Sequence, residues 1–443
     1  MSYNYMTFVI IEFSTLNGHT FITFVYPCNK LIGAFSFMPK NHTADQESVR
    51  KVNTSLVLNA LRLHAPISRA ELANITKLNR STISNIVNVL LEDGLVLEMD
   101  AMESKIGRPG IALALRPEGG AVIGVEIGVG FISVILTDFV ANILWREWVE
   151  CPPTKPQIEI ISEAERLIDQ AISFAKEKYL RVLGIGLGVP GLVNVQKGEL
   201  LFAPNLGWKD VPFRLMWNQR FHLPLFIENE ANLGALGEYY FGVGRDVDNF
   251  IYLSSGVGLG GGIIIDGKLF KGGRGFAGEI GHIQRDPQGE LCGCGRRGCW
   301  ETQVGPRAVL QRVRRVVESD PDNILSKNGN GDLGNLTFNQ VVDCALQGEP
   351  LCLSALEEVG KNLGAGIADL ANIFNPQMVV IGGAFSYGRE IILPVLENTI
   401  STGTLSAVKE DLRVIFSEHG ADACVLGAIA VVLDDILREV ALV

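Results

Sequence analysis

The sequence predicts a mainly α-helical winged helix-turn-helix over residues 41–117, followed by a two-lobed α/β domain over residues 118–443. Closely spaced helix signals fill the first segment, whereas a pattern of strand, glycine turn and strand occurs twice in the second. The 443 residues are 47% hydrophobic and 20% charged, which is enough apolar material for several cores. The net charge of −11 argues against a uniformly basic nucleic-acid-binding protein, but not against one local DNA-binding face.

Residues 1–40 are predicted to be an N-terminal extension of uncertain status. Segments rich in Phe, Thr and Tyr within residues 1–37 match neither of the patterns that follow, so we expect a non-native extension with Met38 as the true start. A genuine extra strand or hairpin is the alternative. Residues 1–29 contain no Lys or Arg, so the basic region of a signal peptide is missing. No apolar run approaches the ~20 residues of a membrane helix, and we expect a cytoplasmic protein.

Three helices are predicted in the winged helix-turn-helix. The spacing of apolar residues predicts the first helix over residues 53–64. Ser68 and Glu71 have the spacing of a capping box, which predicts the start of a second, short helix. The third helix is expected over residues 80–93, and Gly94 is expected to end it.

The third helix has the composition of a DNA-recognition helix. Its apolar stripe consists of Ile83, Ile86, Val87 and Leu90. The other face carries short polar side chains and one cation, with no carboxylate before Glu92. Such side chains reach base edges without repelling phosphates. The predicted DNA-binding residues on this helix are Arg80, Ser81, Thr82, Ser84 and Asn85.

A wing is predicted between strands at residues 95–98 and 111–115. Arg108 lies at its tip and is predicted to reach the minor groove or the DNA backbone. The alternative for the whole segment is an ordinary three-helix packing module with a solvated polar face. Residues 42–119 contain equal numbers of basic and acidic residues, so the segment is less acidic than the rest of the chain and DNA binding is favoured.

The second domain contains a weak internal duplication. Strands at residues 122–128, 131–136 and 143–149 suggest a meander, which a helix near 157–179 and a strand at 182–187 follow. A similar start recurs at residues 250–267, and a buried strand at 378–381 ends in two glycines. Repetition of this kind indicates two α/β lobes with a ligand between them. The glycine-rich loop at residues 256–262 either cradles phosphate or forms a tight hairpin.

One histidine and three cysteines are grouped within 18 residues. They are His282, Cys292, Cys294 and Cys299. This donor set suits a tetrahedral structural zinc site with no open position. Buried free thiols or a redox switch are the alternatives. The other five of the eight cysteines are interpreted as isolated packing residues, namely Cys28, Cys151, Cys344, Cys352 and Cys424.

With these motifs the sequence resembles the ROK family, whose name stands for repressors, open reading frames and sugar kinases. The resemblance covers residues 50–443 and rests on segments 188–191, 204–208, 228–232, 256–262 and 278–301. It implies an actin-like ATPase (RNase H-like) fold, a sugar pocket between the lobes, a zinc site beside that pocket, and usually a homodimer. The sugar contacts that it implies are Asn205, Asn229, Glu230, Glu279, His282 and Glu301.

Several positions depart from the pattern of the family's kinases. Glu230 stands where the kinases have an aspartate base, and a shift of ~1 Å in such a group costs about a hundredfold in rate. The loop at residues 126–130 lacks the aspartate and threonine that contact phosphate, and Val257 replaces a threonine. We therefore interpret the chain as a sugar sensor that has no kinase activity and no catalytic residues.

The resulting hypothesis is a sugar-responsive transcriptional repressor that binds operator DNA as a homodimer. The segment 227–230 is similar to that of the xylose-responsive repressors of the family, which makes xylose the first candidate effector. The main alternative is a ROK-family ATP-dependent sugar kinase with an accessory DNA-binding domain. A regulator that docks on a phosphotransferase protein and a transcriptional activator also remain open.

Overall fold

A computed structural model of the chain describes residues 10–16, 19–25, 46–101, 111–319 and 336–439. The chain divides into two compact units, Met1–Asn53 and Thr54–Val443. In the first unit β1 (Ile10–Leu16) and β2 (His19–Val25) pair as an antiparallel hairpin, in agreement with the β-type composition. Met38 and most of residues 1–40 lie outside the described residues, so the non-native status of this segment stays a prediction.

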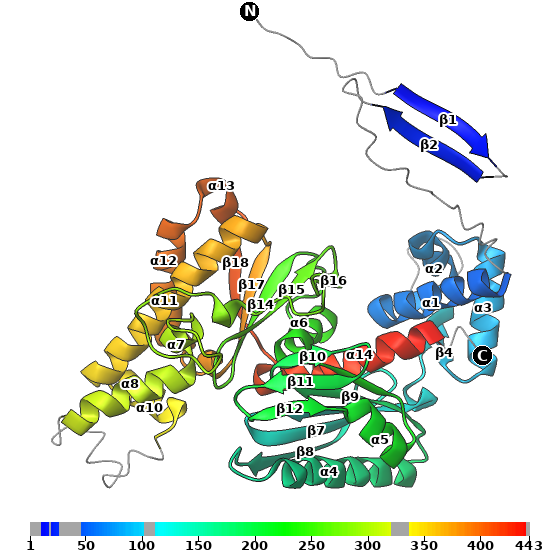
Figure 1. The fold of residues 1–443 in the computed structure, drawn as a ribbon. Coiled ribbons are helices and arrows are strands. Elements are labelled where there is room, and N and C mark those ends of the chain that lie inside the picture. The colour runs from blue at the N-terminus through cyan, green and yellow to red at the C-terminus, as the bar shows by residue number, and fades with distance from the viewer. Residues whose placement is uncertain (1–9, 17–18, 26–45, 102–110, 320–335, 440–443) are drawn as a thin grey trace, which may run out of the picture. The chain divides into compact units, whose positions relative to one another are not determined.

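Three helices and a three-stranded antiparallel sheet form the predicted winged helix-turn-helix (Figure 1). The helices are α1 (Gln46–His64), α2 (Arg69–Thr76) and α3 (Arg80–Glu92). The strands, in sheet order, are β3 (Ile67–Ser68), β5 (Ile111–Leu115) and β4 (Val96–Ala101). Two details differ from the sequence prediction. Helix α1 begins before residue 53, and β3 is too short to show any periodicity.

Local caps set the start of α2 and both ends of α3. The Ser68 side chain accepts a hydrogen bond from the backbone N–H of Glu71, whose carboxylate accepts one from the Ser68 N–H at 2.9 Å. The predicted capping box is therefore confirmed. Asn79 caps α3, because its Oδ1 accepts the Thr82 N–H at 2.8 Å. Gly94 follows α3 with a φ of +71°, a conformation that glycine adopts without strain.

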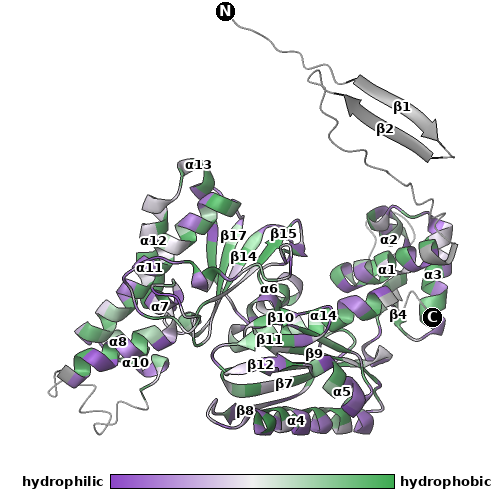
Figure 2. Cartoon of the chain, viewed as in Figure 1, coloured by the Kyte–Doolittle hydropathy of each residue, from purple (hydrophilic) through white to green (hydrophobic). Residues whose placement is uncertain are grey.

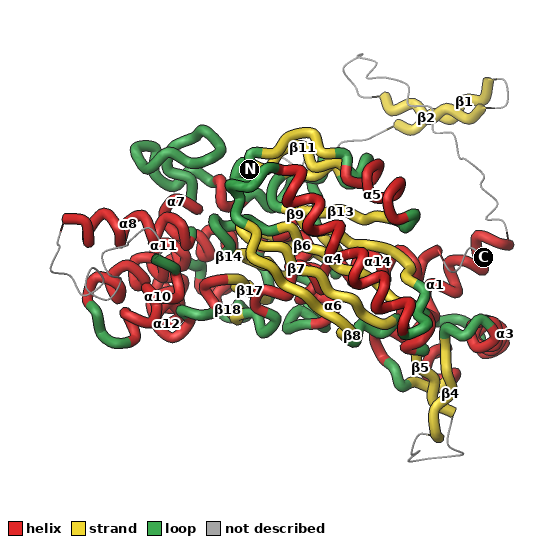
Figure 3. Tube along the Cα trace, turned by 90° about the horizontal axis from the view of Figure 1, so that it is seen from below, coloured by secondary structure: helices red, strands yellow, loops and turns green. Residues whose placement is uncertain are grey.

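The first lobe of the second domain is built on a mixed sheet with the strand order β13-β9-β6-β7-β8. Its strands are β6 (Ala121–Ile127), β7 (Gly130–Asp138), β8 (Ile143–Cys151), β9 (Val182–Val189) and β13 (Leu225–Asn229). Strands β6 to β8 form the predicted antiparallel meander, and β9 runs parallel to β6. Helix α4 (Gln157–Glu177) lies along this sheet (Figure 3) and buries its apolar face against it.

A small antiparallel sheet and one helix extend this lobe. They are β10 (Leu192–Asn194), β11 (Glu199–Ala203), β12 (Trp208–Val211) and α5 (Phe213–Phe221). Trp217 of α5 is fully buried, and its indole N–H donates to the Glu165 carboxylate of α4 at 3.2 Å. This bond anchors the extension on α4.

The second lobe repeats the arrangement with the strand order β16-β15-β14-β17-β18. Its strands are β14 (Phe250–Ser255), β15 (Gly260–Ile265), β16 (Lys268–Leu269), β17 (Met378–Gly383) and β18 (Arg413–Phe416). Strand β14 pairs antiparallel with β15 on one side and parallel with β17 on the other, as β6 pairs with β7 and β9. The weak sequence duplication therefore corresponds to two similarly built sheets.

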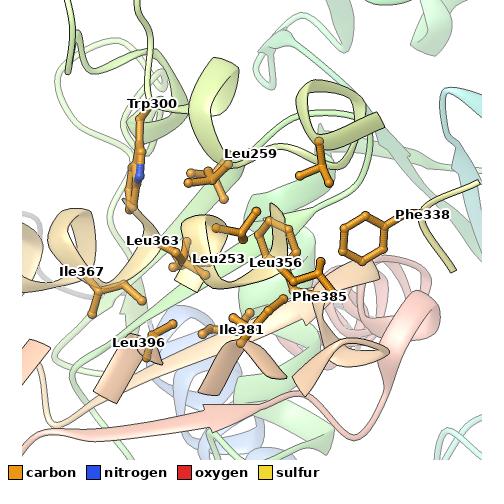
Figure 4. Close-up of a cluster of buried hydrophobic side chains, with 14 of the residues drawn as sticks. Leu253, Leu259, Trp300, Phe338, Leu356, Leu363, Ile367, Ile381, Phe385 and Leu396 are labelled. Atoms are coloured by element: carbon orange, nitrogen blue, oxygen red, sulfur yellow. The ribbon is translucent and has the colours of Figure 1, made fainter. Parts of the chain in front are cut away.

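Helices pack on the second sheet around a large apolar core. They are α7 (Glu301–Val304), α8 (Pro306–Ser319), α10 (Phe338–Leu346), α11 (Pro350–Phe374), α12 (Arg389–Gly403) and α13 (Ser406–Lys409). Figure 4 shows Trp300, Leu363 and Ile381 in this core, and Figure 2 shows hydrophobic colouring along β14 and β17. The Trp300 indole N–H donates to the Asn362 carbonyl at 3.0 Å, which ties the cysteine-rich loop to α11.

Helices α6 (Glu230–Phe241) and α14 (Ala423–Glu439) form a closely packed pair. A Cβ atom at Gly427 would overlap the Leu233 carbonyl oxygen, and one at Gly237 would overlap the Ala423 carbonyl oxygen, so only glycine allows this approach. The last turns of α14 lie in one hydrophobic cluster with α1, through buried residues such as Leu437. Among the helices that the structure describes, none has the length and apolarity of a transmembrane span.

Candidate functional site

A small cavity of about 80 Å³ collects all six predicted sugar-binding residues. Its lining includes Asn205, Asn229, Glu230, Glu279, His282 and Glu301. These residues come from the loop after β11, the β13–α6 junction, the 3₁₀ turn at Ile280–His282 and the start of α7. Carboxylates, amides and an imidazole together provide the paired donors and acceptors that bind vicinal hydroxyls. Residues almost 100 positions apart in the sequence therefore meet in one polar pocket.

Asn229 has a mainly structural role in this pocket. Its Oδ1 accepts hydrogen bonds from the backbone N–H groups of Ala231 at 2.8 Å and Asn232 at 3.3 Å, so it caps α6. Its Nδ2 donates to the Gly191 carbonyl at 2.9 Å. One N–H of the amide is left for a ligand, because an amide group has two donor hydrogens. The sequence alone does not reveal that most of this amide is already occupied by backbone hydrogen bonds.

Glu230 is the first residue of α6 and faces other carboxylates. Burial, followed by the negative charge of Glu279, raises the pKa of Glu230 to about 7. Burial also raises the pKa of Glu279, although the nearby His282 acts in the opposite direction. Glu230 therefore changes charge near neutral pH. Its protonated form can donate a hydrogen bond to a ligand hydroxyl, and its ionised form can accept one from it.

His282 lies between the carboxylates and the cysteines. Its Nδ1 is 3.5 Å from the Cys292 Sγ, whereas its Nε2 is 3.8 Å from the Glu279 carboxylate. Glu301 Oε1 lies 2.9 Å from the same Sγ. The two ring nitrogens thus face different partners. A metal bound to Nδ1 would leave the proton on Nε2, which faces the pocket, and would in this way fix the tautomer of the ring.

The predicted zinc ligands form one compact cluster. The ligand atoms of His282, Cys292, Cys294 and Cys299 all lie within 4.8 Å of one another. The Sγ atoms of Cys294 and Cys299 are 3.6 Å apart, close to the edge of about 3.8 Å that a tetrahedron with ~2.3 Å Zn–S bonds requires. The donor set and its spacing therefore fit a tetrahedral zinc ion.

Backbone geometry brings the cysteines together. Isolated β-bridges join Leu291 to Arg297 and Gln284 to Cys299, so the loop folds back on itself twice. Gly298 has a φ of +63°, and a Cβ atom there would overlap the Asp286 carbonyl oxygen. Cys299 is fully buried. Gly295 also has a positive φ, of +87°, so the backbone of this loop favours glycine at both positions.

Glu228 and Lys271 are positioning residues that the sequence analysis does not single out. Glu228 Oε1 accepts hydrogen bonds from the Asn229 N–H at 3.0 Å and the Asn232 Nδ2 at 3.1 Å. Its Oε2 is 2.6 Å from the Lys271 Nζ. This buried carboxylate therefore ties the loop after β16 to the start of α6. Glu228 lies within segment 228–232, one of the segments on which the resemblance to the ROK family rests, but no local pattern marks Lys271.

A second cavity, of about 710 Å³, shares wall residues with the sugar pocket. The residues common to both are Asn205, Glu230, Ser254, Gly256 and Gly258. The start of the glycine-rich loop at residues 256–262, including Val257, lines the cavity, and so does Glu126. Cys424 at the start of α14 also lines it, and hydrogen bonding links its thiol to Glu126. Cys424 is buried in a small cluster with Leu233 and Ala428, as expected of a packing residue, but it is not isolated, because it also lies at the cavity wall beside Glu126.

The predicted recognition helix has the expected faces. The apolar stripe of α3 is buried, as predicted, and includes Ile83 and Val87 with no exposed surface. Arg80, Ser81 and Asn85 are exposed, whereas Thr82 and Ser84 are partly buried. Ser84 Oγ donates to the Arg80 carbonyl at 2.9 Å. Arg108 lies in residues 102–110, outside the described part of the chain, so its contact with DNA stays a prediction.

Comparison with family models matches the ROK family over residues 122–435 and the MarR family over residues 51–101. The xylose repressor of Caldicellulosiruptor bescii is 37% identical over 397 residues, which cover 90% of this chain and 98% of that protein.

Two solved structures are also similar. A ROK family transcriptional regulator, a homologue of the Escherichia coli Mlc protein, has a TM-score of 0.76 at 28% identity and covers 89% of this chain and 98% of its own. A ROK family glucokinase from Streptomyces griseus, solved with glucose and AMPPNP, has a TM-score of 0.63 at 35% identity. It covers 70% of this chain and 98% of its own. The regulator therefore matches more of this chain than the glucokinase does.

Proposed function

Because the chain belongs to the ROK family and carries a MarR-type segment before the family's domain, we propose that it is a sugar-responsive transcriptional repressor of carbohydrate-utilisation genes. The observation that carries this proposal is the convergence of all six predicted sugar-binding residues on one cavity at the start of α6. Similarity to a xylose repressor over 90% of the chain makes a pentose the first effector to test.

The DNA-binding surface of the proposal is the polar face of α3. Arg80 supplies a cation to a phosphate, and Ser81 and Asn85 offer short donors and acceptors to base edges. The N-terminal end of a recognition helix is the part that enters the major groove. We propose that a homodimer presents two such helices to the half-sites of a pseudo-palindromic operator.

Two helices link the sugar pocket to the DNA-binding segment. Helix α6 begins at Glu230 in the pocket and reaches Tyr240, whose ring lies 4.3 Å from the Arg62 guanidinium of α1. Asp434 of α14 lies 3.6 Å from the same guanidinium. A sugar that shifts the start of α6 would thus alter the packing of α1 against α6 and α14. This requires that the sugar has different affinities for the two positions of α6.

The zinc ion has an architectural role in this proposal. With three thiolates and one imidazole the coordination shell is closed, so the metal holds the loop and orients His282. The zinc-bound loop in turn places Glu279 and Glu301 on the wall of the sugar pocket. Loss of the metal would then remove sugar binding as well as stability.

The test is titration of the purified full-length protein with a panel of monosaccharides by thermal shift. A sugar that binds the folded state raises the melting temperature. The same sugar should release the protein from operator DNA in a fluorescence anisotropy assay. Absence of any stabilising sugar at millimolar concentration would contradict the proposal.

A sugar kinase is the alternative, favoured by the 35% identity to the S. griseus glucokinase. Glu230 occupies the start of α6, and a carboxylate with a pKa of about 7 suits a general base. Val257 offers no hydroxyl to a phosphate, which argues against phosphoryl transfer. A coupled ATPase assay across hexoses and pentoses separates the two functions. Sugar-dependent turnover would favour the kinase.

A further inference from the structure

The cavity of about 710 Å³ is far larger than the monosaccharide pocket that it adjoins. Cavities of roughly 300–1,000 Å³ hold ligands of several rings. Glu230 and Ser254 line both cavities, so the larger cavity lies directly beside the smaller one.

The walls of this cavity favour an uncharged ligand with many hydroxyls. Hydroxyl groups line it from several elements, on Tyr252, Ser254, Ser255, Ser386, Tyr387 and Ser417. Three carboxyl groups also line it, on Glu126, Glu230 and Glu418. Among the described residues of the lining, none is Lys or Arg. A triphosphate would therefore meet carboxylates and no neutralising side chain.

Glu126 makes the cavity a built polar site. Only 6% of its surface is exposed, and no described residue forms a hydrogen bond with its Oε2. Burial and the charge of Glu230 raise its pKa well above the ordinary value, which favours the neutral carboxyl group. A neutral carboxyl group both donates and accepts, as hydroxyl ligands require. A buried polar group without a partner is unfavourable, and a bound hydroxyl would remove that penalty.

We propose that the effector is a neutral disaccharide, with one ring in the pocket of Glu279 and His282 and the second ring in the cavity beside Glu126. This inference rests on the proposed function and deepens it, because it names the class of effector for the same site. The second ring occupies the space next to the loop of Val257, and the ligand carries no charge.

The experiment measures binding by isothermal titration calorimetry with two pairs of probes, xylose with 1,4-β-xylobiose and glucose with cellobiose. The full-length protein should bind one disaccharide at least tenfold more tightly than the matching monosaccharide. Ala421→Phe narrows the cavity from an exposed lining position. It should weaken the disaccharide at least tenfold and leave the monosaccharide within twofold. Asn339→Trp, at another exposed lining position, provides a second variant if the first does not fold.

The matched control is Ala407→Phe, which adds the same side chain at an exposed alanine of α13 outside the cavity lining. It should change neither affinity. A protein that binds a monosaccharide but neither disaccharide would overturn this inference and leave the proposed function intact. A protein that binds no sugar would overturn both. Binding of Mg²⁺-AMPPNP that Ala421→Phe weakens, with disaccharide affinity unchanged by the same variant, would assign the cavity to a nucleotide and also overturn the inference.

Discussion

At the scale of single residues, the pocket depends on carboxyl groups whose charge is controlled by burial. Glu230 and Glu279 each lose part of their hydration, and the charge of Glu279 further disfavours ionisation of Glu230. Glu228 differs, because Lys271 pairs with it and its other oxygen accepts two N–H groups. Two carboxyl groups of one segment thus have different surroundings: Glu230 lines the pocket and is proposed to contact the ligand, whereas Glu228 supports the start of α6.

Glu230→Gln tests the raised pKa of Glu230 through the pH dependence of stability. Between pH 4.5 and about 7 the unfolded state ionises Glu230 before the folded state does, so the wild type loses stability as the pH rises. The rise in pKa corresponds to a change of at most about 3 kcal/mol in the free energy of unfolding, and to less where water in the pocket solvates the carboxylate. The variant should gain stability relative to wild type across this window in urea denaturation. A difference in the free energy of unfolding between Glu230→Gln and wild type that is the same at pH 5 and pH 8 would contradict the raised pKa.

Cys294→Ser tests the metal site. Removing one thiolate should release zinc, lower the melting temperature by several degrees and weaken sugar binding, because the loop carries Glu279 and Glu301. Zinc content by mass spectrometry and thermal unfolding check both effects. Cys344→Ser, at a partly buried cysteine outside the cluster, is the control and should keep its metal. Full metal content in Cys294→Ser would exclude the proposed ligand set.

At the scale of elements, short caps and turns decide where functional side chains lie. Asn229 caps α6 and thereby places Glu230 at the first turn facing the pocket. Asn79 has the same task for α3, so that Arg80 and Ser81 stand at its exposed start. In both helices a residue that we propose to bind a ligand follows directly on the residue that fixes the helix start.

Arg80→Ala tests α3 as the recognition helix. Loss of one phosphate contact should weaken operator binding about fivefold to fiftyfold and lower the salt dependence, while sugar affinity stays unchanged. Fluorescence anisotropy at several salt concentrations measures this. Arg389→Ala, which removes an exposed arginine from α12, serves as the control. Equal weakening by both variants would point to nonspecific charge rather than to α3.

At the scale of the larger compact unit, two glycine-packed helices connect the pocket with α1. Gly237 and Gly427 let α6 and α14 approach so closely that their backbones are in direct contact. Their far turns carry Tyr240 and Asp434, which hold the partly buried Arg62. In the proposed response to sugar, the packed helices α6 and α14 and the Arg62 side chain therefore connect the pocket with α1, rather than a flexible linker.

Arg62→Ala tests this connection. The variant loses the cation–π contact with Tyr240, worth about 0.5–2 kcal/mol. Sugar affinity should stay within threefold, but the sugar concentration that releases operator DNA should rise at least tenfold. Tyr240→Phe keeps the ring and its cation–π contact with Arg62, although it loses the hydroxyl bond to Asp434 at 3.3 Å, so it should respond like wild type. Normal release by Arg62→Ala would refute a role for this contact.

Local patterns were enough to predict most elements of the fold. The capping box at Ser68, the end of α3 at Gly94 and the meander of β6 to β8 all depend on neighbouring residues, and the structure confirms them. Strand β3 and the early start of α1 were not predicted. A two-residue strand exists only because β5 pairs with it, and that pairing is a tertiary contact.

By itself, the sequence determined the chemistry of this protein: the zinc-type donor set, the carboxylates and amides of the pocket, and the missing phosphate contacts at Val257. The tertiary structure decided what each group is free to do. It used most of the Asn229 amide in backbone hydrogen bonds, paired Glu228 with Lys271, and left the Glu126 Oε2 beside a large cavity with no hydrogen-bond partner among the described residues. The physical reason is that burial and hydrogen-bond partners come from residues distant in the chain, and these set both pKa and ligand access.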